Sequence, residues 1–173
     1  MNAIELIGHQ MLQLHEAYDT AVEGLDEEKI HWLPGKGCNH IAFLLWHYLR
    51  TEDNIVQFVI QRKPTVWIEN KWDSHFDLDS KVQGTGMDNN EAREIRLSSL
   101  SDFKSYMDQI WKSTNTYLDV ASNEDIERET KLWPFGERSV RQIFSDNLIN
   151  HGFSHLGEIW AIRGLLGLKG SPF

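Results

Sequence analysis

Cysteine is almost absent from the chain, which has only Cys38 among its 173 residues. A single cysteine cannot form a disulfide within the chain, and this suits a protein of a reducing compartment. The amino-terminal residues also lack the basic start and the unbroken apolar run of a secretory signal peptide. We therefore expect a cytoplasmic protein.

Long apolar runs and an excess of basic charge are lacking too. No stretch approaches the ~20 apolar residues that span a bilayer. Lys and Arg number 17 against 26 Asp and Glu, so the formal net charge is −9. Because an acidic surface repels phosphate backbones and anionic lipid head groups, we expect neither nucleic acid nor membrane as a partner.

Several motifs of other chemistries are missing. The sequence has no glycine-rich phosphate loop, no nucleophile elbow and no CxxC. It also lacks the pair of Glu-x-x-His motifs on facing helices that holds two iron ions in a bundle. Apolar residues, in contrast, make up 40% of the chain, which is enough to build a core. The length suits one domain, which we expect to span 1–173.

Apolar residues recur every three or four positions in four segments, which is the spacing of amphipathic helices. Helix starts are marked by Asn39, a favourable N-cap, and by two capping boxes, Asp88 with Glu91 and Ser139 with Gln142. The predicted helices span about 4–22, 39–62, 88–121 and 139–167.

The second and third predicted helices are separated by ~25 residues without a sustained period, which is longer than most helix–helix connections. A crossing of this length lets the chain travel the height of a bundle, with Trp67, Trp72 and Phe76 against its flank. A turn over 133–136, in a short hairpin, leads to the fourth helix. The fold class is therefore all-α, a four-helix bundle with a long crossover between helices two and three.

His151 and His155 are four residues apart in the predicted fourth helix. Four residues rotate a helix by about 400°, so both rings leave one face about 6 Å apart, as in zinc sites built on paired histidines. The two residues continue an apolar stripe that includes Leu148 and Ile159, and so they face inward. Each could be an ordinary hydrogen-bonded core histidine, but one metal ion would satisfy both rings.

His47 follows Trp46 in the apolar second helix and also faces inward, so it is the predicted third ligand. Three protein ligands leave one coordination position for water or substrate, which is the arrangement of a catalytic metal site. We expect one divalent ion, zinc or nickel first, with iron or copper as alternatives.

Glu158 lies three residues after His155, at the edge of the same face. It is the candidate catalytic base, with a fourth ligand, a group that orients a ligand, and a solvated carboxylate as alternatives. His40, two turns before His47, is interpreted as a helix-start residue, with a substrate contact as the alternative.

Three other residues are interpreted structurally. Arg50 and Asp53 form a predicted helix-surface pair that serves packing or a subunit contact. Cys38 is interpreted as a buried, inert thiol, although a helix-start cysteine can also be reactive. His9, His15, His31 and His75 are expected to have no special role.

Three stretches together resemble the DinB/YfiT family of metal-binding four-helix-bundle proteins. They are Leu33-Pro34-Gly35 with the run from Asn39 to His47, then Arg50-Thr51-Glu52-Asp53, and finally Asn150 to Glu158. The resemblance implies a divalent metal held by His47, His151 and His155, and a homodimer. It also implies an activity among thiol-dependent transferases and isomerases, which use bacillithiol or mycothiol, or among hydrolases.

Two classes of function follow. In the first, the protein is a metal-dependent enzyme acting on small molecules. A low-molecular-weight thiol, bound at the metal as a thiolate, attacks an electrophile. Hydrolysis by metal-bound water is the alternative reaction. In the second, it is a non-catalytic metal-binding stress-response protein. A structural zinc site would normally have a fourth protein ligand, and no fourth cysteine or histidine is evident on the ligand faces, which favours the enzyme.

Overall fold

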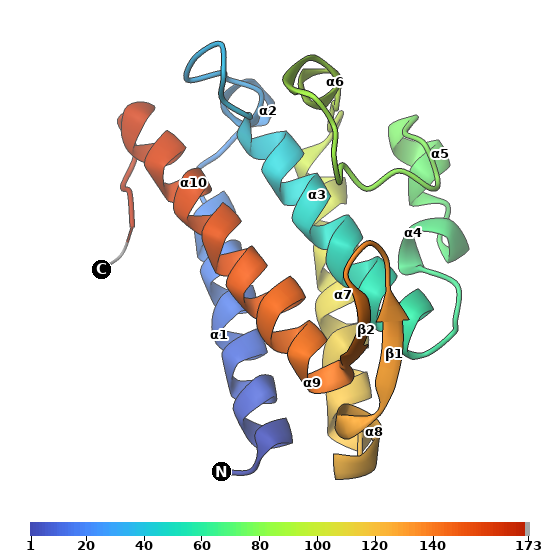
Figure 1. Cartoon of the computed structure of the whole chain (residues 1–173). Coiled ribbons are helices and arrows are strands. Elements are labelled where there is room, and N and C mark those ends of the chain that lie inside the picture. Colours follow the sequence, from blue (N-terminus) through green and yellow to red (C-terminus); the bar gives the residue numbers. More distant parts are fainter. Residues whose placement is uncertain (172–173) are drawn as a thin grey trace.

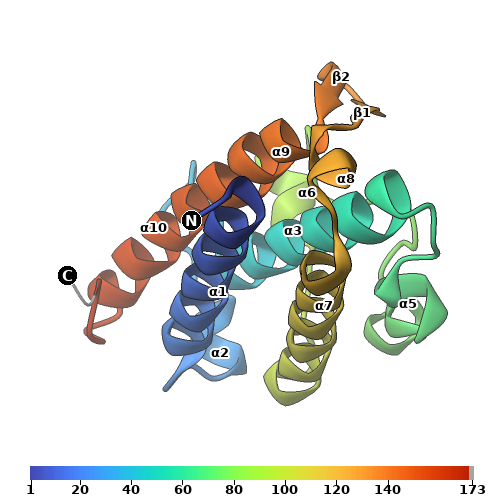
Figure 2. The ribbon, with the colours of Figure 1, turned by 90° about the horizontal axis from the view of Figure 1, so that it is seen from below.

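The computed structural model describes residues 1–171, and its long helices form a bundle (Figure 1). Figure 2 shows the four units around a shared interior. The all-α fold class is thus confirmed. The units are α1 (Ala3–Val22), α3 (Ile41–Asp53) continued by the π-helical segment η1 (Asn54–Ile60), α7 (Leu100–Val120), and α9 (Val140–Gln142) continued by the π-helical segment η2 (Ile143–Asn150) and α10 (His151–Leu165).

Helix α3 is the central element, and all 13 of its residues are buried. It packs against α10 and α7, and its amino-terminal turns are apolar on nearly every side, as the sequence indicates. Trp46 and Tyr48 are among the largest fully buried side chains. Burial of one large apolar side chain contributes about 1.5–3 kcal/mol, so α3 is a main source of the bundle's stability.

The predicted N-cap of this helix was wrong by one residue. The cap is His40, whose Nδ1 accepts a hydrogen bond from the Phe43 amide at 3.0 Å. A neutral imidazole nitrogen can accept such a bond as a carboxamide oxygen does, and His40 is fully buried there. The Asn39 side-chain oxygen is buried without a hydrogen-bond partner.

The predicted third helix is two helices. The capping box of Asp88 and Glu91 is present, but it opens only the five-residue helix α6 (Asn89–Arg93). The chain is then non-helical until Ser99, whose side chain caps α7. In this break the Leu97 amide donates to His31 Nε2 at 3.1 Å, a tertiary contact that replaces a helical hydrogen bond.

The long crossover contains two short helices, α4 (Val66–Glu69) and α5 (Trp72–Phe76), on the flank of the bundle (Figure 1). Trp67 and Phe76 are buried and stack with ring centroids 6.0 Å apart. The remaining short elements are α2 (Glu27–Ile30), α8 (Asn123–Glu127) and an antiparallel hairpin of β1 (Glu129–Leu132) and β2 (Gly136–Ser139), with Leu132 opposite Gly136. The predicted hairpin is confirmed.

Arg50 and Asp53 are not a surface pair. Both are buried, because α4 covers this side of α3. The Asp53 carboxylate accepts from the amides of Val66 and Trp67 at 2.9 Å each, and the Arg50 guanidinium lies 4.8 Å from the Trp67 ring centroid. The pair therefore attaches the crossover to the bundle.

Cys38 is exposed, which corrects the expectation of a buried thiol. It belongs to a turn in which its amide donates to the Gly35 carbonyl at 3.2 Å, before α3 enters the core. Among residues 1–171, no helix combines the length and the apolar character needed to cross a bilayer.

The burial of His40 predicts a pH dependence of stability. Desolvation lowers the pKa of His40 to about 4, against an unfolded value of about 6.5. The unfolded chain binds the proton more tightly than the folded protein does. The stability that the protein has with His40 neutral is therefore fully present above pH ~6.5 and is lost as the pH falls from ~6.5 toward ~4. His40→Asn keeps a capping oxygen and cannot titrate, so it should reduce the loss of unfolding free energy between pH 7 and 5 by roughly 1–2 kcal/mol.

Urea denaturation of both proteins in a metal chelator, at each pH, measures the difference. The other histidines titrate equally in the two proteins and cancel. If the wild type and His40→Asn lose the same unfolding free energy between pH 7 and 5, the lowered pKa of His40 is contradicted.

Candidate metal centre

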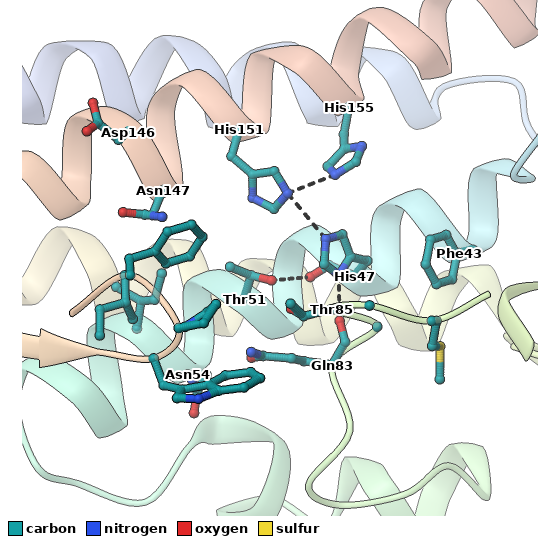
Figure 3. A pocket seen from close by; sticks show the side chains of 18 of the residues that line it. Phe43, His47, Thr51, Asn54, Gln83, Thr85, Asp146, Asn147, His151 and His155 are labelled. Atoms are coloured by element: carbon teal, nitrogen blue, oxygen red, sulfur yellow. Dashed lines mark hydrogen bonds between the residues drawn. The ribbon is translucent and has the colours of Figure 1, made fainter. Parts of the chain in front are cut away.

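Three histidine side chains from two helices meet at one point (Figure 3). His47 comes from the middle of α3, and His151 and His155 come from successive turns of α10. The Nε2 atom of His151 lies 3.2 Å from Nε2 of His47 and 2.8 Å from Nε2 of His155. One ligand atom from each histidine lies within 4.8 Å of the other two. The structure therefore brings the three predicted ligands together.

A close approach of helices holds α10 in this place. Gly152 follows His151, and a Cβ atom there would lie 2.6 Å from Leu14 and 2.8 Å from Tyr48. The Tyr18 hydroxyl donates to the Gly152 carbonyl at 3.0 Å. Glycine at this position thus lets α10 pack directly against α1 and α3, which carries His151 to His47.

The second ring nitrogen of two of the histidines has its own acceptor. Nδ1 of His47 lies 2.5 Å from the carbonyl oxygen of Gln83, and Nδ1 of His155 lies 3.3 Å from Oε2 of Glu158. An acceptor at Nδ1 fixes the proton on that atom and leaves the Nε2 lone pair free, which is the usual arrangement of metal-binding histidines. Gly84 has φ +88°, and a Cβ there would lie 2.9 Å from His47 Nδ1, so the loop needs glycine to close on the ring.

The protonation state of the cluster suits a cation. Burial, together with the neighbouring His155 and His47, lowers the pKa of His151 to about 4. Burial also lowers the pKa of His47. At neutral pH these rings are neutral and present lone pairs to one another, which is unfavourable unless a positive ion lies between them. Nitrogens ~2.0–2.1 Å from one zinc ion would lie roughly 3 Å apart, so the cluster fits a divalent metal.

Glu158 lies behind the cluster. Its side chain is 53% exposed and reaches Nδ1 of His155, on the far side of the ring from Nε2. This position matches a carboxylate that orients a ligand. A base acting on a bound molecule would have to reach the Nε2 side.

A cavity of about 550 Å³ opens beside the three histidines. Its polar wall includes Thr51, Asn54 and Asn147 (Figure 3). The exposed rings of Trp133 and Phe135, from the hairpin turn, also line it. The candidate metal centre is therefore accessible to a small molecule with polar and apolar parts.

A buried polar network under the site was not found from the sequence. The Glu52 carboxylate is fully buried and receives His15 Nε2 at 3.0 Å, the Tyr48 hydroxyl at 2.8 Å and the Thr114 hydroxyl at 2.6 Å. Tyr48 in turn lies edge-on to the His151 ring, with centroids 6.1 Å apart. His15, expected to be ordinary, thus has a buried partner 37 residues away.

The fold and site define a four-helix bundle with a three-histidine cluster at the wall of a cavity. The chain belongs to the DinB superfamily, whose family model matches residues 10–159. A solved structure with a similar fold is the crystal structure of a conserved protein of locus from Enterococcus faecalis, with a TM-score of 0.81 and 19% sequence identity. The match covers 96% of this chain and 99% of that chain, and at this identity it shows the fold alone. A comparison with curated proteins gives no match.

Proposed function

We propose that His47, His151 and His155 bind one divalent metal ion, zinc or nickel, and that the protein is a metal-dependent enzyme acting on small molecules. The observation that carries this proposal is the position of the cluster: three Nε2 atoms converge at the wall of a cavity. Within residues 1–171, no fourth His, Cys, Asp or Glu joins the group. An open coordination position favours a catalytic site over a structural one.

The proposed reaction is transfer of a low-molecular-weight thiol to an electrophile. A bound divalent ion would supply the positive charge that makes a thiolate available at neutral pH. The protein would supply the rest: the Gln83 carbonyl holds the His47 ring, and Glu158 holds the His155 ring. The electrophile would lie against Trp133 and Phe135, with the polar groups of the cavity wall around its reacting end.

The reaction is tested with the cobalt-substituted protein. A thiol that binds at the open position should produce a sulfur-to-metal charge-transfer band, and its conjugation to an electrophile should be faster with metal than without. Hydrolysis of an ester or amide by the zinc protein, with no spectral response to thiols, would instead support the hydrolase. If both activities are absent, the non-catalytic role is favoured.

Glu158→Gln separates the possible roles of this carboxylate. We expect a loss of metal affinity of about tenfold, because an outer partner of a ligand histidine usually changes affinity 10–100-fold and Glu158 is half exposed. Metal competition with a chromophoric chelator measures it, and Glu129→Gln, an exposed residue of β1, is the control. A fall in turnover of ~10²–10⁴-fold with unchanged metal affinity would show that Glu158 is a base instead.

We also propose a homodimer. Arg50 and Asp53 cannot supply the contact because they are buried. Support comes from the DinB resemblance and from exposed apolar side chains on the neighbouring helices α1 and α10, namely Leu6, Leu12 and Phe153. Light scattering at micromolar concentration should give about twice the 20.1 kDa chain mass. A monomer mass that persists at every concentration would exclude the dimer.

A further inference from the structure

A second cavity of about 550 Å³ lies where η1 ends and the crossover begins. We call it the crossover cavity; it is formed by residues of α3, η1, the turn at 62–65, α4 and the segment at 80–81. It shares only Asn54 with the histidine cavity. It is therefore a separate place on the molecule, and the proposed metal chemistry does not use it.

The charged side chains that line the crossover cavity are all basic. Arg50, Arg62, Lys63 and Lys81 line it, and no Asp or Glu does. Acidic residues outnumber basic ones 26 to 17 in the whole chain, so the absence of a carboxylate from this wall is a local departure from the composition. The cavity should therefore attract an anion to an otherwise acidic protein.

Two of the four cations, Arg62 and Lys63, have neutral partners. Arg62 donates to the Thr130 hydroxyl at 3.3 Å and Lys63 donates to the Gln61 carboxamide at 2.8 Å, both neutral acceptors. In the part of the chain that the structure describes, neither residue forms an ion pair, and neither does Lys81. The exposed carboxylate of Asp79 accepts from the backbone amides of Lys81 and Val82, which lower its pKa, and the charges of Lys81 and Arg50 also lower it.

Arg50 is the one buried cation of the cavity, at 3% exposure. Its Nη2 donates to the Ser80 carbonyl at 2.9 Å, and its Nη1 lies 3.8 Å from the Asp53 carboxylate. Neither Nη1 nor Nε has a hydrogen-bond partner. A buried guanidinium with unused donors is costly, and an anion in the cavity would reduce that cost.

The same wall carries large apolar side chains. Phe58 is 56% exposed and Ile68 is 48% exposed, and Pro64 lies in the turn between their helices. An inorganic anion would leave these apolar side chains exposed to water. A molecule with an apolar body would cover it while its charged end meets the cations.

We propose that the crossover cavity binds a small amphipathic anion, a molecule with one carboxylate head and a short hydrocarbon body. The carboxylate lies among the four lining cations, Arg50, Arg62, Lys63 and Lys81, and the hydrocarbon lies against Phe58 and Ile68. Both parts are required, because charge alone does not cover the apolar wall and hydrocarbon alone does not meet the cations.

Titration of the full-length protein with octanoate tests the proposal. Calorimetry at low salt should show saturable binding with a Kd of about 1 mM or tighter. Acetate, which lacks the body, and octylammonium, which has the opposite charge, should bind at least ~10-fold more weakly. Equal binding of octylammonium would overturn the proposal, as would the absence of octanoate saturation.

Variants locate the site. Lys63 and Lys81 are exposed, so the double variant Lys63→Gln/Lys81→Gln should fold normally and bind octanoate about tenfold more weakly. The matched control is Lys104→Gln/Lys112→Gln, which removes two exposed lysines of α7 and should bind as the wild type does. Equal affinity of the two double variants would overturn the proposal.

Two further measurements exclude other places of binding. Octanoate could ligate a metal, so its affinity is also measured for His155→Ala; we expect no change, and loss of binding would place the anion at the histidines. Light scattering is repeated at saturating octanoate, with an unchanged mass expected. Dissociation of an oligomer would show that a second copy covers the crossover cavity, against the proposal.

Discussion

His155→Ala should lower the affinity of the protein for zinc or nickel by at least ~100-fold, because even changes to groups that only orient a ligand cost ~10–100-fold. The variant removes one of three converging nitrogens and leaves His47 and His151 3.2 Å apart. The His155 side chain is 16% exposed and lies at the wall of a cavity, so the bundle should fold without its ring. Plasma mass spectrometry of the purified protein and competition with a chelator measure the loss.

His75→Ala is the control for this experiment. His75 is an exposed residue of α5 whose ring meets Asp102 at 2.9 Å, and it has no contact with the histidine cluster. Its loss should leave the metal content unchanged. A full equivalent of tightly bound metal in His155→Ala would remove the proposed ligand set.

Glu52→Ala should reduce the free energy of unfolding by about 3–5 kcal/mol, because each buried polar group that loses its hydrogen-bond partner costs about 1–3 kcal/mol. The substitution leaves His15, Tyr48 and Thr114 without the acceptor that they share in the core. A loss of this size is a large part of the 5–15 kcal/mol that stabilises a typical domain. Urea denaturation, monitored by tryptophan fluorescence, measures it.

Two companion variants make the result specific. Glu52→Gln keeps the shape and one acceptor oxygen and should cost less, about 1–3 kcal/mol. Glu16→Ala, next to His15 on the exposed side of α1, should change stability by no more than ~0.5 kcal/mol. If Glu52→Ala and Glu16→Ala are equally stable, the buried network does not stabilise the bundle.

Helix positions could be predicted where the signal is local. The spacing of apolar residues gave α1 within one residue, and the capping box of Ser139 and Gln142 opens the fourth helical unit as expected. The capping box of Asp88 and Glu91 also forms, at the start of α6. A capping box, however, marks where a helix begins and not how long it is. The break after Arg93 depends on His31, which is distant in sequence, and periodicity cannot detect such a contact.

The candidate metal ligands were predictable because their signal is also local in the sequence. The four-residue spacing of His151 and His155 fixes their shared face, and the apolar surroundings of His47 indicate that it points inward. The groups that hold the His47 ring were not predictable, because they are the backbone carbonyl of Gln83 and the absent side chain of Gly84. Arg50 and Asp53 have the three-residue spacing of an exposed pair, and only the folded crossover shows that α4 covers them.

The π-helical segment η2 has a consequence for how the cavity can vary. Each π turn holds one residue more than an α turn, so removal of a single residue from 143–150 could be absorbed by restoring α-helical turns. Residues inside the segment would then change their angle about the helix axis, because each residue of an α turn advances by about 100° and each residue of a π turn advances by less. Asp146 and Asn147 would leave the cavity wall, while His151 and His155 would stay fixed by the contact of Gly152 with α1 and α3. Length changes within this segment therefore offer a route to a new substrate preference with the same three histidines.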